Sequence, residues 1–284
     1  MHILMTGAAG MIGRKLTARL IANKKLNGKP IERLTLLDVS APERPENFSA
    51  HVTTLAADLA DPATARASVA GRPDVIFHLA AVVSGEAELD FEKGVHVNFD
   101  GSRALLEAVR ALGNGYRPRF VFTSSIAVFG APFPDSIPDD FALTPLTSYG
   151  TQKAMVELML ADYTRRGFID GIGIRLPNIV VRPGKPNQAA SGFFSSIIRE
   201  PLNGEEATLP VDEGVRNWHA SPRRRTRWQR DRAAHQSDHA GRLLHRRRTD
   251  RRAPAHRRRQ GRGAHPARTG PARATDRRRL ARPV

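Results

Sequence analysis

The sequence contains no cysteine among its 284 residues. Disulfide frameworks, thiolate catalysis and cysteine-based zinc sites are therefore excluded, and a reducing cytosol is the simplest compartment. The sequence also has no apolar run long enough to span a membrane, and its N-terminus lacks the charged segment and apolar core of a signal peptide. We therefore expect a soluble, cytoplasmic protein that is neither membrane-bound nor processed.

Lysine is absent from residues 223–284, although this segment holds 22 of the 45 basic residues, all of them arginine. With only four acidic residues it carries a net charge of +18, whereas residues 1–222 carry −1. A segment with so few large apolar residues cannot bury a core, so we expect disorder. The abrupt change after Pro222 favours GC-rich coding DNA read out of frame; the alternative is an arm that binds nucleic acid through its phosphates.

Residues 1–222 alternate short apolar runs with longer helical patterns, which is typical of an α/β fold with a parallel, doubly wound sheet of Rossmann type. The sequence predicts a nucleotide-binding domain over 1–176 and the start of a smaller, incomplete substrate lobe over 177–222, followed by the tail 223–284. The predicted strands are 3–6, 34–37, 52–55, 75–79, 120–123 and 172–176; the clearest predicted helices are 11–22, 91–112, 148–166 and, in the small lobe, 192–199.

Three glycines with the spacing Gly7-x-x-Gly10-x-x-Gly13 lie where the first predicted strand turns into the first predicted helix. At this place a dinucleotide pyrophosphate needs free backbone N–H groups and a helix N-terminus. Gly7 permits the tight turn, Gly10 lets the backbone approach phosphate, and Gly13 allows close helix–strand packing. We therefore expect this turn, Met11 and Ile12 included, to bind a dinucleotide; a plain tight turn is the alternative.

Acidic residues follow the second and third predicted strands. Asp38 can accept hydrogen bonds from both ribose hydroxyls of adenosine and would repel the extra phosphate of NADP, so NAD is the expected cofactor. Asp58 and Leu59 are predicted to contact the adenine. A loop cap is the alternative for Asp38, and a surface turn for Asp58.

Tyr149 and Lys153 are four residues apart, which places both side chains on one face of a predicted helix. A lysine beside a tyrosine lowers the pKa of the phenol, and the resulting tyrosinate can take a proton from an alcohol as hydride leaves its carbon. Ser125 ends a predicted strand at the edge where ligands bind, and its hydroxyl could hold the substrate oxygen against Tyr149. The tyrosine–lysine spacing alone is common on exposed helices. The prediction that Tyr149 and Lys153 are catalytic therefore depends on Ser125 and the strand that it ends.

Together with His78-Leu79-Ala80-Ala81, Asn98 and the segment 123–130, these motifs resemble the extended short-chain dehydrogenase/reductases over residues 1–222. The resemblance implies that Ser125, Tyr149 and Lys153 are catalytic. It further implies a homodimer formed through the helices 91–112 and 148–166. The remaining residues that the resemblance assigns to the cofactor site are Leu79, Ala80, Ala81, Asn98, which would brace the nicotinamide end, and Pro177.

Within this family, segments 81–88, 175–184 and 218–222 most resemble dehydrogenases of four-carbon sugar acids, which implies oxidation of a C2 hydroxyl to a 2-keto acid. A carboxylate substrate needs an arginine for bidentate binding. Arg182 is the first candidate and Arg175 the second, with a structural ion pair as the alternative for each. The predicted substrate contacts are Ser84, Ser125, Tyr149, Asn178 and Arg182.

A sugar-nucleotide epimerase remains an alternative, because it uses the same tyrosine and lysine. A dehydratase is disfavoured, since Ile126 and Ala127 follow Ser125 where acidic residues would be needed. A non-catalytic NAD-binding protein is the third possibility, because the substrate lobe is interrupted at Pro222. The histidines show no metal-ligand spacing, so no metal site is expected.

Overall fold

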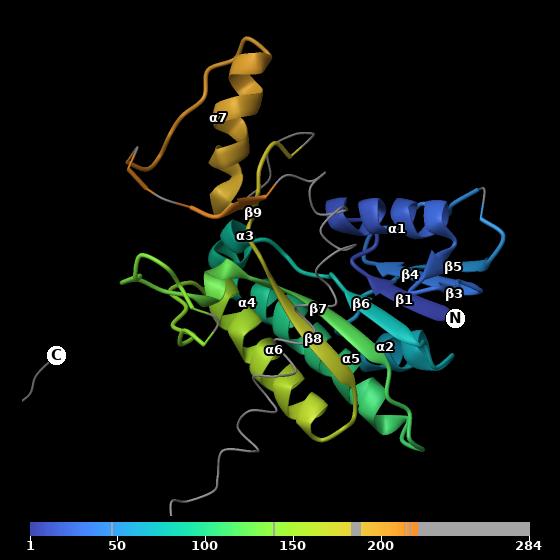
Figure 1. The fold of residues 1–284 in the computed structure, drawn as a ribbon. Helices are drawn as coiled ribbons and strands as arrows, with labels where there is room; N and C mark the ends of the chain where they lie inside the picture. Colours follow the sequence, from blue (N-terminus) through green and yellow to red (C-terminus); the bar gives the residue numbers. More distant parts are fainter. Residues whose placement is uncertain (47, 139, 183–188, 213, 216, 221–284) are drawn as a thin grey trace, which may run out of the picture.

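The computed structural model describes residues 1–46, 48–138, 140–182, 189–212, 214–215 and 217–220 (Figure 1). Its central feature is a six-stranded sheet in the order β5-β4-β1-β6-β7-β8, in which every neighbouring pair is parallel. The predicted Rossmann-type strand order is thereby confirmed. The basic tail 223–284, with the hypotheses about it, lies outside the described residues. The strands are β1 (His2–Thr6), β4 (Arg33–Asp38), β5 (His51–Ala56), β6 (Val75–His78), β7 (Arg119–Ser125) and β8 (Asp170–Leu176).

The central strands are buried on both faces, which explains why they read as continuous apolar runs. Alternate residues of one strand join two different cores: Leu4 packs with helices α2, α5 and α6, whereas Ile3 and Met5 pack with Leu20 of α1. Figure 1 shows α5 and α6 on one side of the sheet and α1 on the other. The helices are α1 (Met11–Asn23), α2 (Pro62–Val69), α3 (Ser84–Leu89), α4 (Phe91–Gly94), α5 (Gly101–Ala111), α6 (Ser148–Arg165) and α7 (Phe193–Leu202).

The predicted helix 91–112 differs from the structure in its middle. A π-helical segment, Val95–Asp100, separates α4 from α5, so the helix carries a wider turn there. Helices α2 and α3 and the small hairpin of β2 (Lys25–Leu26) and β3 (Lys29–Pro30) had no sequence prediction. Helix α2 is short, yet its start is well defined, because the Asp61 carboxylate accepts hydrogen bonds from the N–H groups of Ala63 and Thr64.

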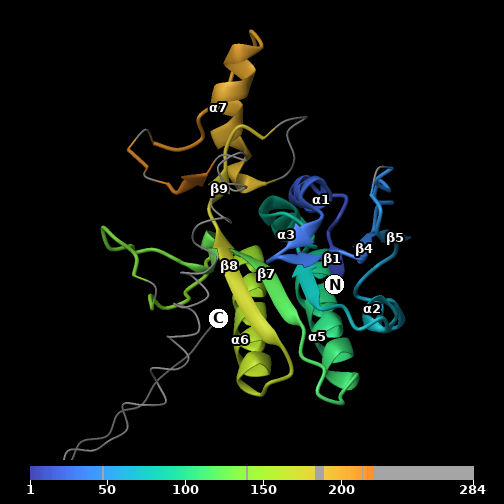
Figure 2. The same cartoon turned by 45° about the vertical axis from the view of Figure 1, so that its right-hand side comes forward.

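After β8 the chain leaves the sheet and forms a short β9 (Asn178–Ile179), which pairs with β10 (His219–Ala220), and the helix α7. Figures 1 and 2 show α7 standing away from the main sheet in both views. Its Ile197, Ile198 and Leu202 are exposed. No helix in the described part of the chain is long and apolar enough to cross a membrane.

Candidate active site

A cavity of about 1140 Å³ lies at the carboxyl ends of the central strands and contains most of the residues predicted for the site. Parallel sheets of this kind bind their ligands at this edge, where crossover loops diverge. The glycine turn and the predicted catalytic residues line the same cavity. The predicted residues found in its lining are Gly7, Gly10, Met11, Ile12, Gly13, Leu79, Ala81, Ser84, Ser125, Tyr149, Lys153, Pro177, Asn178 and Arg182.

The glycine turn is packed so tightly that side chains are excluded from it. Gly7 has φ +71°, and a Cβ added there would lie 2.5 Å from the Ala80 nitrogen. A Cβ on Gly13 would lie 2.3 Å from the Gly7 oxygen. Gly10, the N-cap of α1, has no side chain that could cap the helix, and the first turn holds no acidic residue, so N–H groups at this positive helix end are available to an anion. These features fit a bound pyrophosphate.

Asp38 ends β4 beside this turn. Its carboxylate accepts hydrogen bonds from the Ala9 nitrogen at 3.0 Å and the Ser40 nitrogen at 3.2 Å. Asp38 is not part of the cavity lining, but the hydrogen bond from Ala9 places it directly beside the glycine turn. The predicted ribose contact is thus near the predicted phosphate contact.

Asp58, predicted at the adenine, accepts a hydrogen bond from His96 Nε2 at 2.8 Å. Partial burial acts to raise the pKa of this carboxyl, but the hydrogen bonds from His96 and from the Ala60 nitrogen hold it below its usual value. Its neighbour Leu59 is buried in the core with the helices α2 and α5. Neither residue lines the cavity, and Leu59 faces the core.

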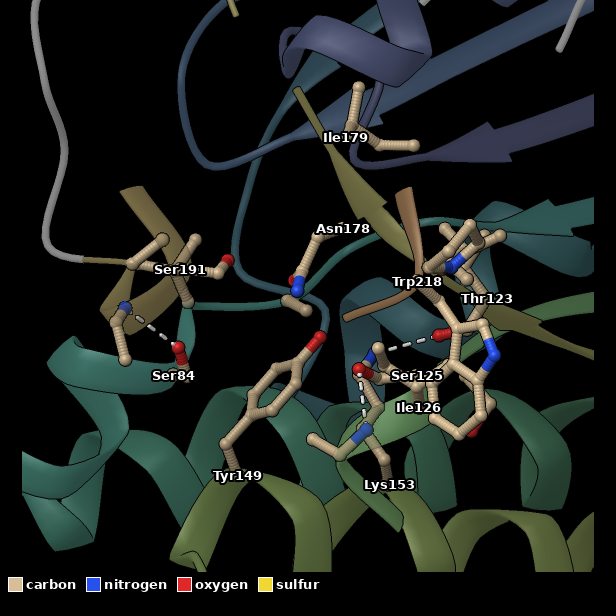
Figure 3. Close-up of a pocket in the computed structure, with 18 of the residues that line it drawn as sticks. Ser84, Thr123, Ser125, Ile126, Tyr149, Lys153, Asn178, Ile179, Ser191 and Trp218 are labelled. Atoms are coloured by element: carbon tan, nitrogen blue, oxygen red, sulfur yellow. Dashed lines mark hydrogen bonds between the residues drawn. The ribbon is translucent and has the colours of Figure 1, made fainter. Parts of the chain in front are cut away.

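Helix α6 carries Tyr149 and Lys153 into the cavity. The Thr147 hydroxyl caps the helix by accepting from the Gly150 nitrogen at 3.0 Å. Gly150 itself lies so close to the Ala127 oxygen that an added Cβ would be 2.2 Å away, so the first turn of α6 packs against the loop after β7. This contact brings Tyr149 to Ser125, and Figure 3 shows the phenol projecting from α6 into the cavity.

The Lys153 ammonium is fully buried and is turned toward the sheet. Its Nζ donates to the Thr123 carbonyl at 2.9 Å and lies 4.8 Å from the centre of the Phe122 ring. Burial lowers the pKa of Lys153 to about 7. The centre of the Tyr149 ring is 5.7 Å from Nζ.

The electrostatics of Tyr149 correct one prediction from the sequence. We expected Lys153 to lower the pKa of the phenol, but the pKa of Tyr149 is raised, because the ring is buried away from water. A hydrogen bond with Ser125 acts in the opposite direction and only partly offsets burial. The lysine does not contribute here since its ammonium binds a backbone carbonyl instead of the phenol.

The far end of the cavity is lined by hydroxyl and amide groups. The Ser84 hydroxyl accepts from the Ala190 nitrogen at 3.0 Å (Figure 3), and the Asn178 amide donates to Asn217 Oδ1 at 2.7 Å. Ser191, Asn217 and Trp218 complete this end. Sequence reasoning missed Ser191, which lies in the single 3-10 turn Ala190–Gly192, and Asn217, which lies in a loop, because neither segment has a recognisable pattern.

The two arginine candidates differ in their surroundings. Arg175 forms a bidentate ion pair with Glu157, its Nη2 lying 2.8 Å from Glu157 Oε2, so the structural alternative holds for Arg175. Arg182 lines the cavity and donates to the oxygens of Ile179 and Ser191. No carboxylate in the described ranges pairs with Arg182. Partial burial, and secondly Arg199, lower its pKa.

Asn98 and Ala80 do not line the cavity. Asn98 is fully buried, and its Oδ1 accepts from the nitrogen of Val82, a lining residue, at 2.9 Å. Ala80 packs against Gly7. Both residues therefore support the cavity from behind. Among the described residues, no group of three or more His, Asp or Glu side chains could hold a metal ion.

A Rossmann sheet with a glycine turn after its first strand, and a serine, a tyrosine and a lysine in the same cavity, is typical of nucleotide-dependent enzymes. Residues 3–223 match the NAD dependent epimerase/dehydratase family, and the chain belongs to this family. NAD is its cofactor, and the predicted class of NAD-dependent dehydrogenase is confirmed.

Two relatives are named D-erythronate dehydrogenase. The protein from Cupriavidus necator is 52% identical over 227 residues, which are 78% of this chain and 69% of the relative. The protein from Haemophilus influenzae is 46% identical over 222 residues, again 78% of this chain and 69% of the relative. The chain is also similar to a crystal structure described as the nucleoside-diphosphate-sugar epimerase from Agrobacterium tumefaciens, with 64% identity, a TM-score of 0.77 and coverage of 81% of this chain and 68% of that one.

Proposed function

We propose that this protein oxidises the C2 hydroxyl of a small sugar acid, D-erythronate or a close analogue, to the 2-keto acid and transfers the hydride to NAD. The observation that carries the proposal is the placement of Tyr149 and Ser125 in the cavity that begins at Gly7. The two relatives named D-erythronate dehydrogenase support the choice of substrate.

In this proposal the glycine turn, with Met11 and Ile12, holds the pyrophosphate, and Asp38 holds the adenosine ribose. Bound NAD supplies the hydride acceptor and a positive charge that favours the phenolate form of Tyr149. Leu79, Ala81 and Pro177 line the space between the turn and the catalytic residues. Asp58 remains a proposed adenine contact, with His96 as its present partner.

The chain's own residues perform the proton transfer. The Ser125 hydroxyl binds the substrate oxygen and orients it toward the phenol. Tyr149 in its phenolate form takes the hydroxyl proton while hydride leaves the C2 carbon, so one alcohol becomes one ketone and the proton remains on Tyr149. Lys153 lies one helical turn behind the phenol, and its bond to the Thr123 carbonyl holds this part of α6 against β7. Because burial raises the pKa of Tyr149, we expect oxidation to become faster as the pH rises.

We assign the substrate carboxylate to Arg182, supported by Ser84 and Asn178. Arg182 is a half-buried cation without a carboxylate partner in the described part of the chain, so an anionic substrate would compensate its charge.

We further propose residues 1–176 as the cofactor domain, 177–222 as the start of the substrate lobe, and a homodimer through the helices around α5 and α6. Leu158 on α6 is 66% exposed, which suits such an interface.

A sugar-nucleotide epimerase is the second candidate, and the similarity to the Agrobacterium tumefaciens structure favours it. The two functions differ in net redox change, because an epimerase returns the hydride whereas a dehydrogenase releases NADH. Incubation with NAD and a panel of four-carbon sugar acids, followed at 340 nm, should give NADH with D-erythronate. Interconversion of UDP-sugars without NADH formation would contradict the proposal in favour of the epimerase.

Asp38→Ala should weaken NAD binding and reduce the preference for NAD over NADP. A hydrogen bond to a charged group contributes about 1.5–3 kcal/mol, so we expect the KM for NAD to rise about 10- to 100-fold. Loss of the negative charge also removes the repulsion of the NADP phosphate. Asp38→Asn is the matched control, since it keeps an acceptor for the Ala9 nitrogen but lacks the charge. Steady-state kinetics with both cofactors measure the effect, and an unchanged KM would remove Asp38 from the cofactor site.

Lys153→Met should abolish turnover and yet stabilise the fold near neutral pH. The folded pKa of Lys153 is about 7 against an ordinary value of 10.5, so only the unfolded chain binds the proton between these values. Wild-type stability therefore rises with pH across this interval, and the variant should lack that rise. We expect a gain of up to about 5 kcal/mol below pH 7 that disappears by pH 10.5. Urea unfolding at several pH values measures it; equal pH slopes for the two proteins would contradict the buried charge.

A further inference from the structure

A buried pair of amide side chains connects the catalytic helix to the wall of the cavity. Gln152, next to Lys153 on α6, accepts a hydrogen bond through Oε1 from Asn98 Nδ2 at 2.7 Å. Asn98 Oδ1 in turn accepts from the nitrogen of Val82 at 2.9 Å. Both side chains are at most 1% exposed, and neither lines the cavity, whereas Val82 does. The chain of contacts therefore leads from α6 to the loop after β6.

The direction of each hydrogen bond follows from the donors. The Val82 N–H can only donate, so Asn98 must present its oxygen there and its NH₂ group to Gln152. Gln152 must then present its oxygen to Asn98. This leaves Gln152 Nε2 buried without a hydrogen-bond partner among the described residues. An unpaired buried donor lowers stability, and an apolar side chain at this position would avoid that loss. We therefore attribute the presence of glutamine here to its oxygen, which accepts the hydrogen bond from Asn98.

Two backbone features allow this contact. The π-helical segment Val95–Asp100 turns Asn98 into the interior, and π-helical turns are rare and concentrated at functional sites. Gly94 precedes it, and a Cβ there would lie 2.8 Å from Gln152 Nε2. The helix 91–111 is therefore shaped around the Gln152 side chain.

Gln152 and Lys153 attach α6 in two different directions. Lys153 Nζ binds the Thr123 carbonyl of β7, and Gln152 binds Asn98 of the π-helical segment. Because successive residues point about 100° apart around a helix, two such bonds resist rotation of α6 about its axis. Rotation of α6 would move the Tyr149 phenol relative to Ser125 and to the wall at Val82.

We propose that Gln152 is a positioning residue, whose hydrogen bond to Asn98 fixes the Tyr149 phenol relative to the cofactor side of the cavity at Val82. The kinetic part of this inference rests on the dehydrogenase function proposed above. The structural part does not, because it concerns only the coupling between α6 and the loop 79–83.

The test compares Gln152→Met, which keeps the side-chain length but removes the acceptor, with Ser102→Ala. Ser102 is a matched control: it is equally buried and donates to the Asn98 backbone oxygen, but it has no bond to α6. In the full chain, Gln152→Met should lower kcat about 10- to 100-fold, because small misplacements of reacting groups have effects of this size. Its KM for NAD should change less than threefold, since Asn98 still binds Val82. Ser102→Ala should lower the melting temperature with little change in kcat.

Amide hydrogen exchange provides a readout that needs no substrate. Exchange in peptides covering residues 79–83 should accelerate in Gln152→Met and remain at the wild-type rate in Ser102→Ala. If Gln152→Met leaves this exchange unchanged, the coupling is wrong whether or not the chain turns over a sugar acid. If wild type forms NADH and the two variants lose kcat equally, Gln152 has only a structural role. If wild type forms no NADH from any sugar acid but the exchange effect is present, the substrate proposal fails and the coupling stands.

Discussion

Tyr149→Phe is expected to lower kcat about 10²- to 10⁴-fold, the range found when a general base is removed. The phenylalanine ring keeps the buried shape of the tyrosine, so the free energy of unfolding should change little. Only the hydroxyl that we propose as the proton acceptor is lost. In the proposed binding mode NAD is held mainly at the glycine turn and Asp38, so its affinity should stay within about threefold of wild type.

Stopped-flow NADH formation and NAD titration measure these two quantities separately. Tyr163→Phe is a suitable control: Tyr163 lies on the same helix, and its hydroxyl donates to Glu107 far from the cavity lining. The Tyr163 variant should keep wild-type kcat. A Tyr149→Phe enzyme that retains more than about a tenth of wild-type kcat would require a different base.

Gly13→Ala should abolish measurable NAD binding. The added Cβ would lie 2.3 Å from the Gly7 oxygen and 2.7 Å from Ala8, both backbone positions that cannot move independently. The first turn of α1 must then separate from the glycine turn, which removes the N–H groups from the phosphate position. We expect the Kd for NAD to rise more than about 100-fold, a loss of roughly 3 kcal/mol.

Gly173→Ala is the matched control for this substitution. The same methyl group is added in β8, but its nearest neighbour is the Leu160 side chain at 3.6 Å, an ordinary contact. Isothermal titration with NAD should give wild-type affinity for Gly173→Ala. Far-ultraviolet circular dichroism of both variants separates loss of the site from loss of the fold. Normal NAD affinity in Gly13→Ala would show that the turn does not bind the pyrophosphate.

The sheet could be predicted because its central strands are buried on both faces and are therefore continuously apolar. The same holds for the glycine turn, whose spacing and position after β1 carry their own physical meaning. The π-helical segment could not be predicted, since an extra residue in one turn hardly disturbs the apolar periodicity of 91–112. Sequence also gave no reason to separate Leu59, which is buried in the core, from its neighbour Asp58.

A second limit of the sequence is that it does not show which side chains or backbone groups contact one another. From the sequence Arg182 was the first candidate and Arg175 the second, with an ion pair possible for each, and only the fold shows that Arg175 pairs with Glu157 whereas Arg182 lies at the cavity. In the same way, the spacing of Tyr149 and Lys153 predicts a shared helix face but not the carbonyl that takes the ammonium. The pKa of Tyr149 follows from that detail and from burial, so its direction was not accessible from the pattern.

His78, the last residue of β6, is buried outside the cavity lining and takes part in two side-chain hydrogen bonds. The Ser102 hydroxyl donates its single proton to the backbone oxygen of Asn98, so it must accept a hydrogen bond from His78 Nε2. His78 Nδ1 then accepts a hydrogen bond from the hydroxyl of Thr6, the residue before the glycine turn. Complete burial, and secondly Lys153, lower the pKa of His78 to about 3. From pH 5 upward the imidazole therefore stays uncharged, and none of these bonds reverses. A bell or step in the pH–rate curve of this enzyme above pH 5 would consequently not come from the titration of His78.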